Sequence, residues 1–127
     1  MRLFTLTVQL APSQAFRLRS WLQERLDDSR LSLQATADLV LAADEAFALA
    51  LGRCRGRCEA TVRVSVLDDD VYLTVSDNAR DAPQAASDPF AITLLERLAD
   101  QLQLEEDDRG RTVRVVKRSA RARDAVA

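Results

Sequence analysis

The chain has 127 residues, of which 47% are apolar and 30% are charged, and its net charge is −2. This length suits one globular domain, and the composition is that of a folded protein rather than a disordered one. The small net charge gives no general attraction to nucleic acid or to an anionic membrane, and no apolar run approaches the roughly 18 residues of a membrane span. The first residues alternate apolar and polar, unlike the continuous apolar block of a signal peptide. We therefore expect a cytoplasmic protein with no nucleic-acid or membrane partner.

The N-terminal half predicts one strand and two helices. Apolar residues alternate with polar ones from Phe4 to Leu10, a period of two that is typical of a half-buried strand. Ser13 is the expected cap of a helix over about 13–28, and Ser32 that of a second helix over about 33–52.

The C-terminal half predicts two hairpins separated by a loop and a helix. Residues 60–67 and 71–77 alternate around an acidic turn, and residues 101–105 and 112–117 do the same. Residues 78–89 form the expected loop, and Asp88 with Pro89 opens a third helix to about 100. The order of elements predicts an α+β two-layer sandwich, in which three helices cover one face of a mostly antiparallel mixed sheet. We expect one domain over 1–118 and a flexible tail over 119–127.

The second helix has two apolar faces, which is unusual for a surface helix. Turning 100° per residue places Leu33, Val40 and Phe47 on the face toward the sheet. The opposite face carries Glu45 and Leu49 among small and apolar neighbours, so a loop, a ligand or another chain is expected to cover it.

The two cysteines, Cys54 and Cys58, lie just after this helix, and the chain has no histidine. Two thiols without further soft ligands do not make a structural zinc site. A disulfide is conceivable, but a cytoplasmic compartment disfavours it, so two ordinary thiols are expected.

Several strings in this order resemble the GHKL (histidine-kinase-like) ATPase fold and, more narrowly, the anti-sigma-factor serine-protein kinases of bacteria. Residues 45–50 read EAFALA where that family has Glu-Ala-x-x-Asn-Ala, and residues 77–81 read DNARD where it has Asp-x-Gly-x-Gly. Residues 89–92 read PFAI for Gly-x-Gly-Leu, residues 97–100 end the helix with RLAD, and residues 110–115 read GRTVRV for Gly-x-Thr before a strand. The resemblance covers about residues 4–118 and implies a Bergerat-type ATP site.

The resemblance assigns roles to four residues that could form an adenine and catalytic end. Asp77 would accept a hydrogen bond from the adenine amino group, Thr112 would support it, and Asn78 would also contact the nucleotide. Glu45 would activate the attacking hydroxyl if the protein is an active kinase. Three of the four also have an ordinary explanation: a strand end for Asp77, and solvent-facing positions for Thr112 and Glu45.

The phosphate and metal end departs from the family pattern. Leu49 replaces the asparagine that would hold magnesium, and a leucine offers no oxygen to a hard cation. Ala79 and Asp81 replace the first glycine pair, and Asp81 would repel a polyanion. Pro89 and Ala91 replace the second pair, and proline has no amide hydrogen to donate. The sequence therefore predicts a degenerate site with no resident metal or cofactor, although ATP with magnesium stays possible.

Three functions follow from this comparison. The first is an anti-sigma-like regulatory protein that binds a sigma factor or a STAS-domain antagonist, with a homodimer plausible from the resemblance. Trp21 on the first helix is a candidate contact, and core packing is its alternative role. The second is an active ATP-dependent serine-protein kinase, and the third is an adenine-nucleotide sensor without turnover.

Overall fold

The structure is a computed structural model, and it describes residues 2–79 and 89–119. Within them, five strands form one sheet in the order β1-β2-β3-β5-β4. The strands are β1 (Arg2–Gln9), β2 (Glu59–Leu67), β3 (Asp70–Asp77), β4 (Gln101–Asp107) and β5 (Gly110–Lys117). The helices are α1 (Ala15–Leu26), α2 (Leu33–Arg53) and α3 (Pro89–Leu98), and a short 3-10 turn, η1 (Pro12–Gln14), precedes α1.

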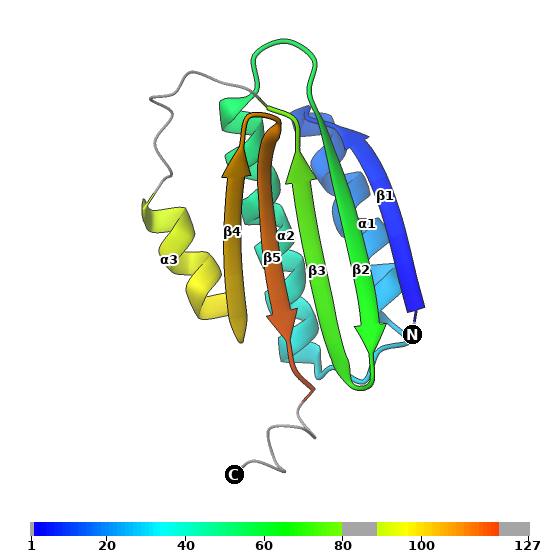
Figure 1. Cartoon of the computed structure of the whole chain (residues 1–127). Coiled ribbons are helices and arrows are strands. Elements are labelled where there is room, and N and C mark those ends of the chain that lie inside the picture. Colours follow the sequence, from blue (N-terminus) through cyan, green and yellow to red (C-terminus); the bar gives the residue numbers. More distant parts are fainter. Residues whose placement is uncertain (1, 80–88, 120–127) are drawn as a thin grey trace.

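The helices cover one face of the sheet, as Figure 1 shows, and the other face is open. Each of the four strand pairings is antiparallel, so the sheet is more uniform than the expected mixed one. Alternate strand residues such as Val62, Leu73 and Val115 point toward the helices and are almost fully buried. They meet Leu22 of α1 and Phe47 of α2 in one core, and the predicted α+β sandwich is confirmed.

The second helix begins as predicted and the first does not. Ser32 caps α2, because its hydroxyl accepts a hydrogen bond of 3.0 Å from the amide of Ala35. Ser13 instead lies inside η1, and α1 starts after Gln14 without a side-chain cap. Pro12 fixes the backbone of that first turn and shifts the helix start by two residues.

The burial predicted for α2 is wrong at two positions. Leu33 is 91% exposed, since it is the first residue of the helix and lies beyond the core. Ala42, which the same 100° rotation per residue places with Glu45 on the face away from the sheet, is fully buried. The helices α1 and α3 both pack against α2, so the sides of this helix are covered from within the same chain.

A buried ion pair fixes the end of the sheet farther from the α2 C-terminus. The Nζ atom of Lys117 lies 2.9 Å from a carboxylate oxygen of Asp38 on α2 and donates to the carbonyl oxygen of Leu98 at 2.7 Å. Its side chain is only 5% exposed. One ammonium group thereby joins β5 to α2 and to the end of α3.

Two predicted segments fall largely outside the described residues. The loop over 78–89 and its cap Asp88 lie there except for Asn78, Ala79 and Pro89, and so does the tail after Ser119. Ser119 itself is buried. Among the residues described, no helix is both long and apolar enough to cross a bilayer.

Candidate functional site

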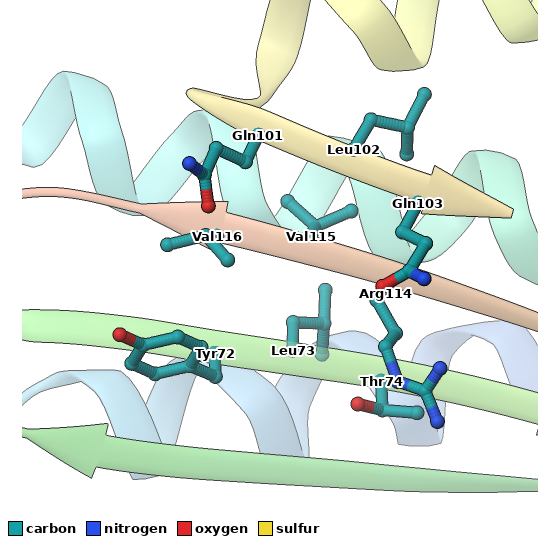
Figure 2. A pocket seen from close by; sticks show the side chains of 9 residues that line it. All are labelled: Tyr72, Leu73, Thr74, Gln101, Leu102, Gln103, Arg114, Val115 and Val116. Carbon is teal, nitrogen blue, oxygen red and sulfur yellow. The ribbon is translucent and has the colours of Figure 1, made fainter.

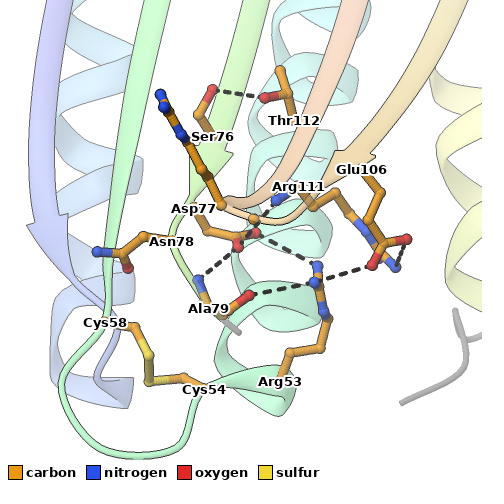
Figure 3. A network of polar contacts seen from close by, with 12 residues as sticks. Arg53, Cys54, Cys58, Ser76, Asp77, Asn78, Ala79, Glu106, Arg111 and Thr112 are labelled. Carbon is orange, nitrogen blue, oxygen red and sulfur yellow. Dashed lines mark hydrogen bonds and ion pairs between the residues drawn. A yellow bond between two sulfur atoms is a disulfide. The ribbon is translucent and has the colours of Figure 1, made fainter. Parts of the chain in front are cut away.

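Three segments meet at one end of the sheet. The C-terminal end of α2, the end of β3 and the turn between β4 and β5 lie together there (Figure 1). The polar side chains that these segments bring together are drawn in Figure 3. Asp77, the last residue of β3, lies at their centre with a side chain that is 5% exposed.

The two carboxylate oxygens of Asp77 have different surroundings. Oδ1 accepts hydrogen bonds from the backbone amides of Ala79 at 3.0 Å and Arg111 at 3.4 Å. Oδ2 faces Nη1 of Arg53 at 3.9 Å, which is too long for a hydrogen bond. Within the described part of the chain, Oδ2 therefore keeps its capacity to accept a hydrogen bond from a ligand.

Arg53 connects Asp77 to the neighbouring strands. Its Nη2 donates to the carbonyl oxygen of Ala79 at 3.4 Å and to Oε1 of Glu106 at 3.1 Å. Glu106 also pairs with Nη2 of Arg111 at 3.6 Å, so one carboxylate holds two guanidinium groups. Arg53 is 11% exposed and Arg111 is 4% exposed, so both charges are largely removed from solvent.

Burial raises the pKa of the Asp77 carboxyl above its ordinary value of 3.8. The hydrogen bond from Ala79 and the positive charge of Arg53 lower that pKa, and they offset the burial only in part. On α2, burial likewise raises the pKa of Asp44, although Arg19 opposes the shift.

Gly110 allows β5 to approach the Asp77 backbone. Its φ is +147°, and a Cβ built at this position would lie 1.8 Å from the carbonyl oxygen of Asp77. The next nearest atoms, 2.7 Å and 3.1 Å away, also belong to the backbone, of Asp77 and Asn78. Only glycine fits here, and this contact brings the Arg111 amide to Asp77.

The structure does not bring all the predicted nucleotide-binding residues together. Thr112 is hydrogen-bonded through its hydroxyl to Ser76 at 3.1 Å, on the open face of the sheet, whereas Asp77 faces α2. The residue of β5 that lies on the Asp77 side is Arg111. Asn78 uses its side-chain oxygen to accept from the Glu59 amide at 2.7 Å, so it ties β2 to β3.

The residues of α2 named by the resemblance lie apart from this network. Glu45 and Leu49 are both half-buried, one turn apart on the helix. Leu49 packs against the hydrophobic core, where the family asparagine would present an oxygen. Among the described residues, Glu45 makes no ion pair.

The residues that replace the family glycines have structural roles wherever the structure describes them. Ala79 is fully buried, and its amide donates to Asp77 rather than pointing to an open site. Pro89 is the first residue of α3, and Ala91 is buried in that helix. Asp81 lies outside the described residues.

Cys54 and Cys58 form a disulfide, which corrects the expectation of two ordinary thiols. Their Cα atoms lie 6.0 Å apart, within the usual range for a bridge. The residues are four apart in sequence, and Gly56 between them adopts a φ of +91°, which lets the short loop turn back. Figure 3 shows the bridge beside Arg53 and Asn78.

A separate hollow of about 700 Å³ lies across β3, β5 and β4 on the open face of the sheet (Figure 2). Tyr72, Gln101 and Gln103 line it together with Arg114, whose guanidinium already pairs with Glu105 at 2.8 Å. It lies on the other side of the sheet from Asp77 and so forms no part of the same site.

Arg53 and Arg111 are the functional candidates that sequence reasoning missed. In the sequence Arg53, Arg55 and Arg57 resemble a solvated arginine-rich loop, yet Arg53 is the last residue of α2. The alternation of β5 was the available signal for Arg111, because it lies two residues before buried Val113 and therefore on the same face.

The five-stranded antiparallel sheet, the three helices on one of its faces and the acidic residue that ends β3 beside α2 are the arrangement that the resemblance to the histidine-kinase-like ATPase fold implies. A family model described as "Histidine kinase-like ATPase domain" matches residues 8–117, and the chain belongs to this family. No curated protein matches the sequence.

Two solved structures support the same fold. The crystal structure of the RsbU and RsbW domains of Rv1364c from Mycobacterium tuberculosis is similar with a TM-score of 0.75 and 18% identity, over 93% of this chain and 32% of that one. The EL346 blue-light activated histidine kinase of Erythrobacter litoralis is similar with a TM-score of 0.65 and 14% identity, over 88% of this chain and 42% of that one. The chain thus spans less than half of either protein.

Proposed function

We propose that this chain is a cytoplasmic regulatory protein of the anti-sigma type, which binds a sigma factor or a STAS-domain antagonist and does not transfer phosphate. The observation that carries the proposal is Leu49. A leucine side chain packed against the core stands where the family uses an asparagine to hold magnesium. Phosphoryl transfer needs a metal to bridge phosphate oxygens, and a hydrocarbon side chain provides no ligand for it.

The state of Ala79 supports the same proposal. In the resembling proteins a glycine amide approaches the phosphates here. In this chain the Ala79 amide donates to Asp77 and its carbonyl oxygen accepts from Arg53. The amide is the only backbone donor of this residue, and because it already donates to Asp77 it is not available to a phosphate.

Calorimetry with magnesium-ATP, ADP and adenosine tests the loss of the phosphate site. We expect magnesium to make no difference to the affinity for any of them. Transfer of labelled phosphate from ATP to a STAS-domain protein, abolished by Glu45→Ala, would instead establish the active kinase and refute the proposal. Sedimentation velocity of the chain alone and with a sigma factor then tests the homodimer and the protein partner.

A second candidate, an adenine-nucleotide sensor without turnover, is favoured by Oδ2 of Asp77. This oxygen accepts no hydrogen bond from the described residues, and it belongs to the carboxylate that the resemblance assigns to the adenine amino group. Asp77→Asn should weaken adenosine binding, because an amide has only one acceptor oxygen and here Oδ1 is used twice. Asp70→Asn, at the opposite end of β3, is the matched control and should leave the affinity unchanged.

A further inference from the structure

The disulfide joins two segments that both support the environment of Asp77. Cys54 directly follows Arg53, whose guanidinium contacts Asp77, Ala79 and Glu106. Cys58 directly precedes Glu59, whose amide donates to the side chain of Asn78 and whose carbonyl oxygen accepts from the Asn78 amide at 3.2 Å. The carbonyl oxygen of Cys58 also accepts from Leu10 at 2.9 Å, which fixes this end to the core.

We propose that Cys54 and Cys58 are a reversible dithiol–disulfide switch that holds Arg53 against Asp77 when oxidised and releases this carboxylate to an adenine amino group when reduced. The adenine part rests on the nucleotide-sensing candidate above. Nη1 of Arg53 lies 3.9 Å from Oδ2 of Asp77 in the disulfide-bonded structure. It makes no hydrogen bond to this oxygen, but it stands beside it, where the amino group of adenine would have to lie in order to donate to Oδ2. A contact that keeps Arg53 near this oxygen therefore competes with adenine.

The positions of the two residues explain how the bridge controls Arg53. Arg53 is the last residue of α2, and Cys54 already has an extended backbone, with φ −78° and ψ 129°. The ends of helices fray unless they are held, since their last carbonyls lack partners within the helix. The bridge ties this end to β2, and its reduction leaves the last turn of α2 free to reorient.

The surroundings of the cysteines favour exchange. Arg53, Arg55 and Arg57 flank them, and positive charge stabilises the thiolate that attacks a disulfide. Arg55, Gly56 and Arg57 are exposed and Cys54 is half-buried, so a small reagent has an approach. A disulfide in a cytoplasmic protein is more often a redox sensor than a permanent brace.

The chemical step balances with a small-molecule disulfide as the oxidant. Two S–H bonds of Cys54 and Cys58 break and one S–S bond forms, so the pair loses two protons and two electrons. The small disulfide gains them and becomes two thiols, and the reverse reaction reduces the bridge.

The first test is a titration of the folded protein in glutathione redox buffers, followed by alkylation of free thiols and mass measurement. We expect the two cysteines to convert together and reversibly while the far-ultraviolet circular dichroism stays native. A bridge that stays closed in excess reduced glutathione, or opens only when the chain unfolds, overturns the proposal.

The second test compares adenosine affinity and amide hydrogen exchange in the two states. Reduced protein and oxidised Arg53→Gln should both bind adenosine roughly five- to tenfold more tightly than oxidised wild type, the effect of losing one competing contact. Exchange at the Ala79 amide should accelerate in both. Oxidised Arg55→Gln is the matched control and should resemble oxidised wild type, and Cys54→Ser with Cys58→Ser should resemble the reduced form.

The outcomes separate the switch from the sensor. Equal adenosine affinity in both redox states refutes the switch and leaves the sensor intact. If adenosine binds in neither state, the sensor fails and amide exchange decides the switch: faster exchange at Ala79 on reduction supports it, and unchanged exchange overturns it.

Discussion

Replacing Gly110 by alanine tests how tightly β5 is packed against Asp77. The added Cβ would lie 1.8 Å from a backbone oxygen, and its next neighbours are also backbone atoms. No flexible side-chain end can move aside, so the strands must separate locally or the backbone must leave its φ of +147°. An unfavourable backbone conformation costs about 1–3 kcal/mol, and overpacking a tight contact costs a similar amount.

We therefore expect Gly110→Ala to lower the free energy of unfolding by about 3–5 kcal/mol, out of the roughly 5–15 kcal/mol typical of a domain. Urea unfolding followed by circular dichroism measures this as a lower midpoint at an unchanged slope. Gly52→Ala is the matched control, because nothing lies within 4 Å of its added Cβ. Alanine favours a helix over glycine, so this variant should gain up to about 1 kcal/mol. A Gly110→Ala protein within about 0.5 kcal/mol of wild type would refute the reasoning.

The other predictions concern charge and packing. Lys117→Met should lower the free energy of unfolding in urea by about 2–4 kcal/mol, because it leaves Asp38 and the Leu98 carbonyl oxygen without their shared donor; a change below about 0.5 kcal/mol would contradict the buried pair. Because the pKa of Asp77 is raised, its contribution to stability is fully present below the unfolded pKa of 3.8 and is lost as the pH rises through the folded pKa. The unfolding free energy of Asp77→Asn minus that of wild type should therefore increase as the pH rises above 3.8, and a decrease in urea titrations across this range would contradict the sign. Leu49→Asn should cost about 1–2 kcal/mol in the same assay because it places an amide where methyl groups pack against the core, and it should not restore phosphate transfer by itself, since the Ala79 amide still donates to Asp77 and Pro89 has no amide hydrogen; transfer of labelled phosphate from ATP by this variant would contradict the prediction.

Much of the fold could be predicted because hydropathy periods and caps act locally. The alternation in β2, β3 and β5 and the Ser32 cap were correctly interpreted, since each depends on neighbouring residues alone. Leu33 was misplaced because an apolar residue at a helix start can fit the helical period and still lie beyond the core. How far along a helix the core extends is decided by the elements that pack against it, and a helical wheel drawn for one helix gives no information on those elements.

The candidate site was less predictable because it depends on which faces meet. Asp77 was identified from a string, but the string could not show that α2 ends at Arg53 and directs this side chain to the carboxylate. Thr112 was assigned through Gly-x-Thr alone, and the pleat of β5 puts its side chain on the opposite face from Asp77. The disulfide was not predicted because a cytoplasmic compartment was expected to disfavour it. That expectation was given more weight than the short separation of the two cysteines in the sequence.

Lys117 is the only lysine in the sequence, and the fold encloses its amino group between Asp38 and Leu98. Amine-reactive labels and cross-linkers will therefore find no accessible lysine on the native surface. When the chain unfolds, this nitrogen becomes reactive. The rate at which Lys117 is acylated therefore measures how often that end of the molecule opens.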